Sequence, residues 1–350
     1  MIWQKQLLDW YEVYKRDFPW RETKDPYHIW LSEIIMQQTR TQQGLPYYKA
    51  FVETYPTVHD LAAAPEEAVL KLWQGLGYYS RARNLHSTAQ YISRELGGLF
   101  PSDFETLKTL KGVGDYTASA IASIAFGVKQ AVVDGNVYRV YARFFGIDVP
   151  INSAPAFKHF KAIAQNVLPA SDPGTFNQAV MELGALQCSP QQPKCSICPL
   201  QRECKAYALQ QVAHLPVKEK RSKIKKRFFH YLVFDCGDEK KYLQQRTAKG
   251  IWYKLYEFPL VEANHTLKKP NQKFNEVIQR FTKDPFVVRQ MAPPQLHKLS
   301  HQHIEISFWE VKLTDIRIDG YDWEQWHQLP VPVPIANFLK ENETSKNSYI

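Results

Sequence analysis

Four cysteines near the middle of the chain constrain its fold more than any other feature. Cys188, Cys195, Cys198 and Cys204 are separated by six, two and five residues, and the 350-residue chain holds only five cysteines in all. Thiolates grouped this tightly are best interpreted as ligands of one inorganic centre, either tetrahedral zinc or an iron–sulfur cluster. Zinc sites usually pair two C-x2-C arms, and only the middle gap has that length. The spacing therefore favours a cluster.

The residues around the four cysteines are typical of an exposed loop. Prolines and charged side chains lie between them, including Pro193, Lys194 and Arg202, which argues against four ordinary core cysteines. Disulfide bonds are disfavoured because nothing else marks an exported protein. The N-terminal residues include charged side chains such as Lys5 and Asp9 in place of an apolar signal segment. We therefore expect a cytoplasmic protein in a reducing compartment.

Composition indicates a globular chain without a membrane-spanning segment. Hydrophobic residues make up 44% and charged residues 23% of the sequence, as in ordinary globular proteins. The longest weakly apolar stretch, residues 116–133, is rich in Ala and Ser and contains Lys129, so it is too polar to cross a bilayer. The length of the chain allows two domains with cores of their own.

The formal net charge of +9 favours a polyanionic partner. Much of this charge lies in the segment Lys218–Arg227, where seven residues are basic and one is acidic. The segment is either a phosphate-contacting strip between domains or a solvated linker. Charge alone does not choose between these two interpretations.

The hydrophobic pattern changes along the chain. Up to about residue 205 the apolar residues recur at helical spacing, as in residues 64–73 and 157–167. After the basic segment, β-rich stretches follow at residues 228–234, 241–245 and 303–311. The pattern therefore predicts helices in the first part of the chain and a sheet in the second.

The predicted fold class is multidomain, with an all-α domain followed by an α+β domain. The all-α domain would cover residues 1–205 and include the cysteine loop at 188–204. A basic linker would follow at residues 206–227, and the α+β domain would cover residues 228–345.

A glycine-rich turn lies between two stretches with helical patterns, residues 104–110 and 116–126. The turn consists of Lys111, Gly112, Val113 and Gly114. Two glycines one residue apart allow a tight turn and a close approach of the backbone to a ligand. Free N–H groups at the start of the second helix would favour a phosphate. An ordinary helix–helix turn explains the same residues, because short glycine motifs are weak signals alone.

Two carboxyl groups are candidates for catalysis. Glu33 is flanked by bulky apolar residues, so burial can raise its pKa enough for it to hold a proton. Asp134 follows an apolar, strand-like run and precedes Gly135. Two carboxyl groups in different environments suit cleavage of a glycosidic bond, one as the acid and one stabilising positive charge on the sugar. The alternatives are a solvated helix face for Glu33 and a helix N-cap for Asp134.

Taken in order, these motifs resemble those of one DNA-repair superfamily. The order is Glu33, the glycine-rich turn, Asp134 and the cysteines at the spacing C-x6-C-x2-C-x5-C. It resembles the helix-hairpin-helix DNA glycosylases that carry a [4Fe–4S] cluster. Within them the chain is most similar to the MutY-type adenine DNA glycosylases, and the similarity covers nearly the whole chain. The matching motifs are residues 30–33, 37–39, 75–81 and 134–136.

The resemblance implies a role for each matching residue. Glu33 would protonate adenine as the acid, and Asp134 would stabilise the positively charged sugar, assisted by Tyr116 and Asn136. The implied DNA contacts are Lys111, Gly112, Val113, Gly114, Gln37, Gln38, Thr39, Tyr78 and Arg81. The implied base-recognition residues are Trp20, Arg21, Ser300 and His301. The implied ligands of the [4Fe–4S] cluster are Cys188, Cys195, Cys198 and Cys204.

One position separates this type from its relatives. The endonuclease III type has a Schiff-base lysine two residues after the hairpin glycine, where this chain has Tyr116. Without an amine nucleophile there, we expect base removal without strand cleavage. Some relatives also carry a lysine that traps the abasic product, where this chain has Tyr138. We therefore do not expect such trapping.

Residues 243–259 resemble the MutT-like, Nudix-fold domain of these glycosylases. The acidic Nudix box that a metal-dependent hydrolase needs is not found in the sequence, so we expect this domain to bind and not to hydrolyse. Family members contact 8-oxoguanine with a Phe-Ser-His motif. Ser300 and His301 match its last two residues, and Leu299 departs from the first.

The implied function is a monofunctional adenine DNA glycosylase of base excision repair. Its partner would be double-stranded DNA with 8-oxoguanine:adenine or guanine:adenine mispairs, from which a flipped adenine is removed. The protein would act as a monomer, associated with a bacterial-type nucleoid. A bifunctional glycosylase-lyase for oxidised pyrimidines is the first alternative, and Tyr116 argues against it. An inactive DNA-damage sensor is the second, and the presence of both Glu33 and Asp134 argues against it.

Overall fold

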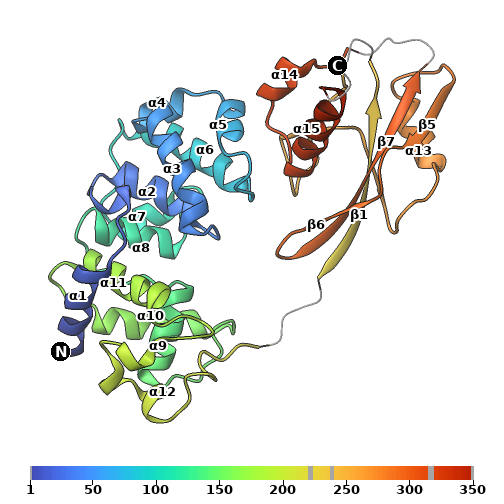
Figure 1. The fold of residues 1–350 in the computed structure, drawn as a ribbon. Helices are drawn as coiled ribbons and strands as arrows, with labels where there is room; N and C mark the ends of the chain where they lie inside the picture. The colour runs from blue at the N-terminus through green and yellow to red at the C-terminus, as the bar shows by residue number, and fades with distance from the viewer. Residues whose placement is uncertain (1, 220–223, 237–239, 314–318, 348–350) are drawn as a thin grey trace. The chain divides into compact units, whose positions relative to one another are not determined.

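The computed structural model describes residues 2–219, 224–236, 240–313 and 319–347 (Figure 1). Contacts divide the chain into two compact units. The first consists of Met1–Ala64 and Arg83–Arg221, and the second of Pro65–Ala82 and Ser222–Ile350. Residues 220–223 of the basic segment lie outside the described residues. Within the described ranges, no helix is long and apolar enough to cross a membrane.

Helices occupy the chain up to residue 208, as the fold class predicted for this region. The α-helices are α1 (Ile2–Tyr14), α2 (Pro26–Met36), α3 (Thr41–Thr54), α4 (Val58–Ala63), α5 (Glu66–Leu72), α6 (Ser80–Glu95), α7 (Phe104–Thr109), α8 (Asp115–Ile124), α9 (Gly135–Phe145), α10 (Ala156–Val167), α11 (Pro173–Leu186) and α12 (Lys205–Ala208). Three short 3-10 helices are η1 (Pro19–Arg21), η2 (Cys195–Ile197) and η3 (Gln201–Glu203).

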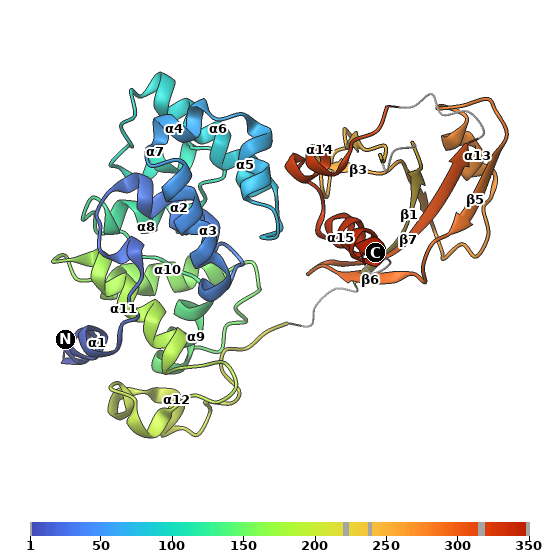
Figure 2. The same ribbon diagram turned by 45° about the horizontal axis from the view of Figure 1, so that its top comes forward.

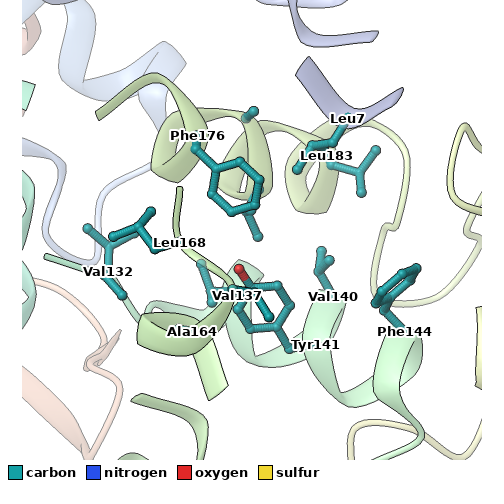
Figure 3. Packing of buried hydrophobic residues seen from close by; sticks show 14 of the residues in the cluster. Leu7, Val132, Val137, Val140, Tyr141, Phe144, Ala164, Leu168, Phe176 and Leu183 are labelled. Atoms are coloured by element: carbon teal, nitrogen blue, oxygen red, sulfur yellow. The ribbon is translucent and has the colours of Figure 1, made fainter. Parts of the chain in front are cut away.

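The helices of the first unit form two lobes. Helices α1, α9, α10, α11 and α12 lie together, and α2, α3, α4, α7 and α8 lie together in the other lobe (Figures 1 and 2). In the first lobe, Leu7 of α1 and Leu183 of α11 pack with Val140 and Phe144 of α9 (Figure 3). These apolar residues recur at helical spacing, and their burial holds the three helices together.

The strand-like run before Asp134, residues 129–133, has no regular secondary structure and pairs with no strand among the described residues. Side chains satisfy its backbone instead. The Gln165 amide oxygen on α10 accepts from the Ala131 N–H at 2.9 Å, and Lys161 Nζ donates to the Ala131 carbonyl at 2.6 Å. Asn177 on α11 accepts from the next N–H. Buried backbone groups need such partners, so α10 and α11 fix the path of the chain into α9.

The second unit contains a mixed sheet. Its strands are β1 (Lys225–Phe234), β2 (Gln244–Gln245), β3 (Tyr256–Glu257), β4 (Leu260–Ala263), β5 (Phe286–Gln290), β6 (Gln295–Lys298) and β7 (Gln302–Leu313). Its helices after β4 are α13 (Gln272–Ile278), α14 (Trp323–Gln328) and α15 (Val333–Asn347). The β-rich stretch expected at residues 241–245 is mostly irregular, because only Gln244–Gln245 pair with β3.

The strands run in the order β4-β1-β7-β5, with β6 also paired to β7. Strands β1 and β7 are parallel, and the other pairs are antiparallel. Phe308 and Trp309 are neighbours on β7 and point to opposite faces. Phe308 stacks on Phe338 of α15 with ring centroids 3.9 Å apart, and Trp309 contacts Phe274 of α13. Helices therefore cover both faces of the sheet, as in an α+β fold.

Candidate active site

A pocket in the first unit brings together several residues that the sequence singled out. Trp20 and Arg21 come from η1, Glu33 comes from α2, and Gln178 and Met181 come from α11. With Ile124 of α8, apolar and polar side chains from four elements thus converge on one cavity. Such a pocket is the default candidate for chemistry in a structure without ligands.

Glu33 is partly exposed in this pocket but enclosed by protein on most sides. Burial raises its pKa from 4.5 to about 7, against a hydrogen bond with Tyr116 and the charge of Arg21, which both lower the pKa. The nearby Asp134 carboxyl adds to the rise. Glu33 can therefore hold a proton near neutral pH, as a general acid must.

Asp134 is the N-cap of α9, so the N-cap alternative describes its backbone correctly. Its Oδ1 accepts from the N–H groups of Asn136 and Val137 at 2.9 and 2.7 Å, and its Oδ2 accepts from the Asn136 amide at 2.8 Å. Burial raises the pKa of Asp134, while these donors and the charge of Arg139 oppose the rise. Donors on both oxygens favour the ionised form.

The two carboxyl groups differ in their hydrogen-bond donors. Burial raises the pKa of both carboxyl groups, but at Asp134 three N–H donors oppose the rise and favour the anion. Tyr116 on α8 shares a hydrogen bond with Glu33, and its own pKa is raised well above 10 by burial and by the two carboxyl groups. Carboxyl pairs with environments this different can divide acid and stabilising roles between them.

The glycine-rich turn joins α7 to α8. Gly112 has φ +82, and a Cβ there would lie 2.7 Å from the Cβ of Asn84. Gly114 is the N-cap residue of α8 and has no side chain to cap it. Val113 is buried while its neighbours Lys111, Gly112 and Gly114 are exposed. The turn thus presents backbone and one lysine to solvent beside a helix N-terminus, which suits a phosphate.

The loop after α2 contains Gln37, Gln38 and Thr39. The Gln37 amide donates to Thr117 Oγ1 at 3.1 Å, which ties this loop to α8. Gln38 is exposed and has φ +56, a backbone conformation that costs free energy for a residue other than glycine. Non-glycine residues in this region are enriched at functional sites, so the loop remains a candidate DNA contact.

The four cysteines line one small pocket beside Arg143 of α9. Arg143 Nη1 donates to Cys188 Sγ at 3.3 Å. Burial raises the pKa of the Cys198 thiol to about 11, so a bound metal would be needed to hold it as a thiolate. The thiols are all free of disulfides. This donor set and the adjacent cation fit an anionic iron–sulfur centre.

A single zinc ion is the alternative to a cluster at these cysteines. Tetrahedral zinc with Zn–S bonds of about 2.3 Å draws its four thiolates to within about 4 Å of one another. In the part of the chain that the structure describes, no three His, Cys, Asp or Glu side chains form a group that could hold a metal ion. A cluster of several iron atoms spans a wider set of thiolates. The preference for a cluster, first drawn from the spacing, stays a prediction.

The second unit holds the remaining candidate residues. Ser300 and His301 form the turn between β6 and β7, where the Leu299 N–H donates to the Gln302 carbonyl at 2.8 Å. Tyr78 is 40% exposed, has φ +49, and shares a hydrogen bond with Ser300 Oγ. The structure thus joins two residues that lie 222 positions apart in the sequence.

Arg81 has a different environment from the other expected DNA contacts. Its side chain is only 9% exposed. The guanidinium lies over the Trp73 ring, 5.0 Å from its centroid, and donates to the carbonyls of Leu76 and Gly77. In this conformation Arg81 stabilises the turn that carries Tyr78. A direct contact between Arg81 and DNA stays a prediction.

Sequence patterns missed three residues around the pocket. Gln178 lines it, and its Oε1 accepts from the Tyr11 hydroxyl at 2.8 Å. Arg139 donates to Asn136 Oδ1 at 2.8 Å and so supports the Asp134 cap. Glu182 is buried and binds two arginines. Only Glu182 had a local signal, as the one charged residue in the otherwise uncharged helix α11.

Comparisons with known proteins agree with this architecture. Residues 31–165 match the HhH-GPD superfamily of base excision DNA repair proteins, and residues 230–341 match the NUDIX domain. The adenine DNA glycosylase of Buchnera aphidicola subsp. Baizongia pistaciae is 33% identical over 88% of this chain and 85% of its own length. The adenine DNA glycosylase of Mus musculus is 46% identical over 58% of this chain and 41% of its own length.

Among solved structures, a thermostable thymine-DNA glycosylase aligns with a TM-score of 0.55 and 31% identity. The alignment covers 59% of this chain and 96% of that protein. Together with the two domain matches, it confirms the predicted fold class, a helical glycosylase domain followed by a Nudix-like domain.

The raised pKa of Glu33 predicts a pH-dependent effect of Glu33→Gln on stability. Between pH 4.5 and about 7 the folded chain holds a proton on Glu33 that the unfolded chain releases, so the free energy of unfolding falls as pH rises. The difference in free energy of unfolding between Glu33→Gln and wild type should therefore depend on pH. Relative to its value below pH 4.5, this difference should shift in favour of the variant by about 1–3 kcal/mol at pH 8. Thermal unfolding across this range measures the change. Glu95→Gln, at the exposed end of α6, is the control, and an identical profile for the two variants would contradict the buried carboxyl.

Proposed function

The chain belongs to the adenine DNA glycosylase family, and from that premise we propose that it removes adenine paired with 8-oxoguanine or guanine in duplex DNA. Adenine excision in base excision repair is the activity of the family, and it makes the protein a DNA N-glycosylase. The base opposite the adenine is part of our proposal. The observation that carries it is the pairing of Glu33, whose pKa burial raises to about 7, with an Asp134 that accepts from N–H donors.

The reacting base must leave the helical stack to reach this pocket, because the bond between base and sugar is inaccessible in a duplex. Trp20 and Arg21 in the pocket wall would hold the flipped adenine. Gln38 and Tyr78, both exposed and both in the left-handed backbone region, would fill or flank the gap that it leaves. The turn at Gly112 would bind a backbone phosphate without recognising sequence.

Glu33 would donate its proton to N7 of adenine, so that the base leaves as a neutral molecule when the bond to the sugar breaks. The sugar is then positively charged, and the Asp134 carboxylate would stabilise it. Asn136 holds the second oxygen of Asp134 and keeps it oriented. Water adds to the sugar, and its proton returns to a carboxylate. The product is an abasic site with the strand intact, since Tyr116 provides no amine to form a Schiff base.

We also propose that Cys188, Cys195, Cys198 and Cys204 hold a [4Fe–4S] cluster. Glycosylases of this superfamily generally carry an iron–sulfur cluster, and the four thiols share one pocket. When bound, the cluster would join the four ligands covalently and so fix the loop against α9. Its partners in the chain include Arg143, which donates to Cys188 Sγ.

Single-turnover measurements of adenine release test the catalytic roles. Glu33→Gln cannot donate the proton and Asp134→Asn lacks the charge, so each should slow release by at least about a hundredfold. Both variants should still bind the mispaired duplex, because neither change removes a phosphate contact. Glu95→Gln should retain the wild-type rate. A near-normal rate for Glu33→Gln or Asp134→Asn would show that its role is misassigned. Wild type should yield an abasic product that breaks only after alkali or heat.

Metal analysis tests the cluster. Purified wild-type protein should contain about four iron atoms per chain and absorb broadly near 400 nm, as iron–sulfur proteins do. Cys198→Ser should lose iron or become insoluble, because one of four ligands is gone. Replacement of Cys236, which lies in the second unit far from the others in sequence, should leave the iron content unchanged. Zinc in place of iron in fully active protein would overturn the assignment.

The turn at Ser300 and His301 should determine preference for the opposite base. Loss of a polar contact with a base edge typically costs about 1–3 kcal/mol of discrimination. The double variant Ser300→Ala, His301→Ala should therefore lose its preference for 8-oxoguanine:adenine over guanine:adenine, while its rate on guanine:adenine changes little. Gln295→Ala, exposed on β6 of the same hairpin, is the control. Unchanged selectivity in the double variant would assign lesion recognition to residues outside this turn, such as Gln38, Thr39 and Tyr78.

A further inference from the structure

Glu182 is a buried carboxylate that the proposed mechanism does not use. Its side chain is 2% exposed, and it is the only charged residue of α11. Its Oε1 accepts from Nε of Arg16 at 2.7 Å and from the backbone N–H of the same residue at 3.0 Å. Its Oε2 accepts from Arg16 Nη2 and Arg21 Nη2, both at 2.8 Å. One carboxylate therefore binds two guanidinium groups.

The ion cluster of Glu182, Arg16 and Arg21 adjoins the candidate active site. Arg21 lines the pocket that contains Glu33, and its second guanidinium nitrogen donates to the Arg16 carbonyl at 2.8 Å. The Arg21 guanidinium thus has fixed partners on both sides, one of them Glu182. Met181, the residue before Glu182, lines the same pocket. Glu182 is thus one of the two partners that Arg21 contacts beside the pocket.

The ion cluster also sets the charge beside Glu33. The groups that face Glu33 are Tyr116 from α8, Asp134 before α9 and Arg21 from η1. Only Arg21 is positive, and its charge opposes protonation of Glu33. Two arginines lower the pKa of Glu182 to about 2, so its negative charge persists over the whole working range of pH. That charge offsets the positive charge of Arg21.

We propose that Glu182 is a positioning residue for adenine excision, which fixes Arg21 in the pocket wall and offsets its positive charge beside Glu33. The proposal rests on the proposed role of Glu33 as the acid. A merely structural ion cluster would affect stability and leave the protonation of the acid unchanged. A change in the total charge of Arg16, Arg21 and Glu182 therefore distinguishes a positioning role of Glu182 from a structural one.

The experiment is a pH profile of single-turnover adenine release with saturating enzyme. In wild type, Arg16, Arg21 and Glu182 together carry a charge of +1. Glu182→Gln raises this charge to +2, so the midpoint of the alkaline limb should move to lower pH by about half a unit or more. Arg16→Gln lowers it to zero, so the midpoint should move to higher pH. The double variant restores +1 and should return the midpoint toward that of wild type.

Opposite shifts in the single variants and recovery in the double variant support the proposal. Wild-type midpoints in all three variants would overturn it, whatever their rates or melting temperatures, because Glu182 would then be structural only. If Glu182→Gln does not fold, Arg16→Gln decides, since Arg16 is partly exposed and Glu182 keeps Arg21 as its partner. A wild-type profile without an alkaline limb near pH 7, or a normal rate for Glu33→Gln, would instead contradict the role of Glu33.

Discussion

The burial of the Glu33 carboxyl beside the Tyr116 hydroxyl is the constraint on which the first unit depends. A carboxyl group keeps its proton near neutral pH only where protein replaces water around it, and here α2, α8 and α11 provide that enclosure. Helix α8 begins directly after Gly114 and carries Tyr116 in its first turn. One short rigid helix therefore joins the exposed backbone of the glycine-rich turn to the partner of the acid. A phosphate bound at the turn would lie at a fixed position relative to Glu33.

Residues with a local signal could be predicted from the sequence, and residues defined by distant partners could not. Apolar spacing located the helices. The strand-like run before Asp134 has no strand partner among the described residues, because side chains of α10 and α11 bind its backbone. Arg81 belongs to a matching motif, yet it folds back onto its own turn. Glu182 is a lone charge in an uncharged helix, which suggests a buried ion pair. Arg16 and Arg21 lie more than 160 positions away, so no local pattern could identify them.

The second unit uses its sheet as a scaffold for contacts. A divalent cation takes several oxygen ligands. Helix α13 has a single carboxylate, Glu276, so this helix alone does not provide them. Its Phe274 packs on the sheet, so this helix contributes to the core. The long strand β7 carries the turn with Ser300 and His301 at one end. A parallel partner, β1, supports β7 along ten residues, which keeps the turn in a defined place.

The side-chain anchoring of residues 129–133 has a consequence for local stability. The amide hydrogens of Ala131 and Val132 are bonded to Gln165 and Asn177, on two different helices, and both residues are buried. Exchange of these hydrogens with solvent requires α10 or α11 to separate from the segment. An irregular stretch of chain is thereby anchored to the two helices. The approach to Asp134 should be as protected from hydrogen exchange as a core helix, although it contains no regular secondary structure.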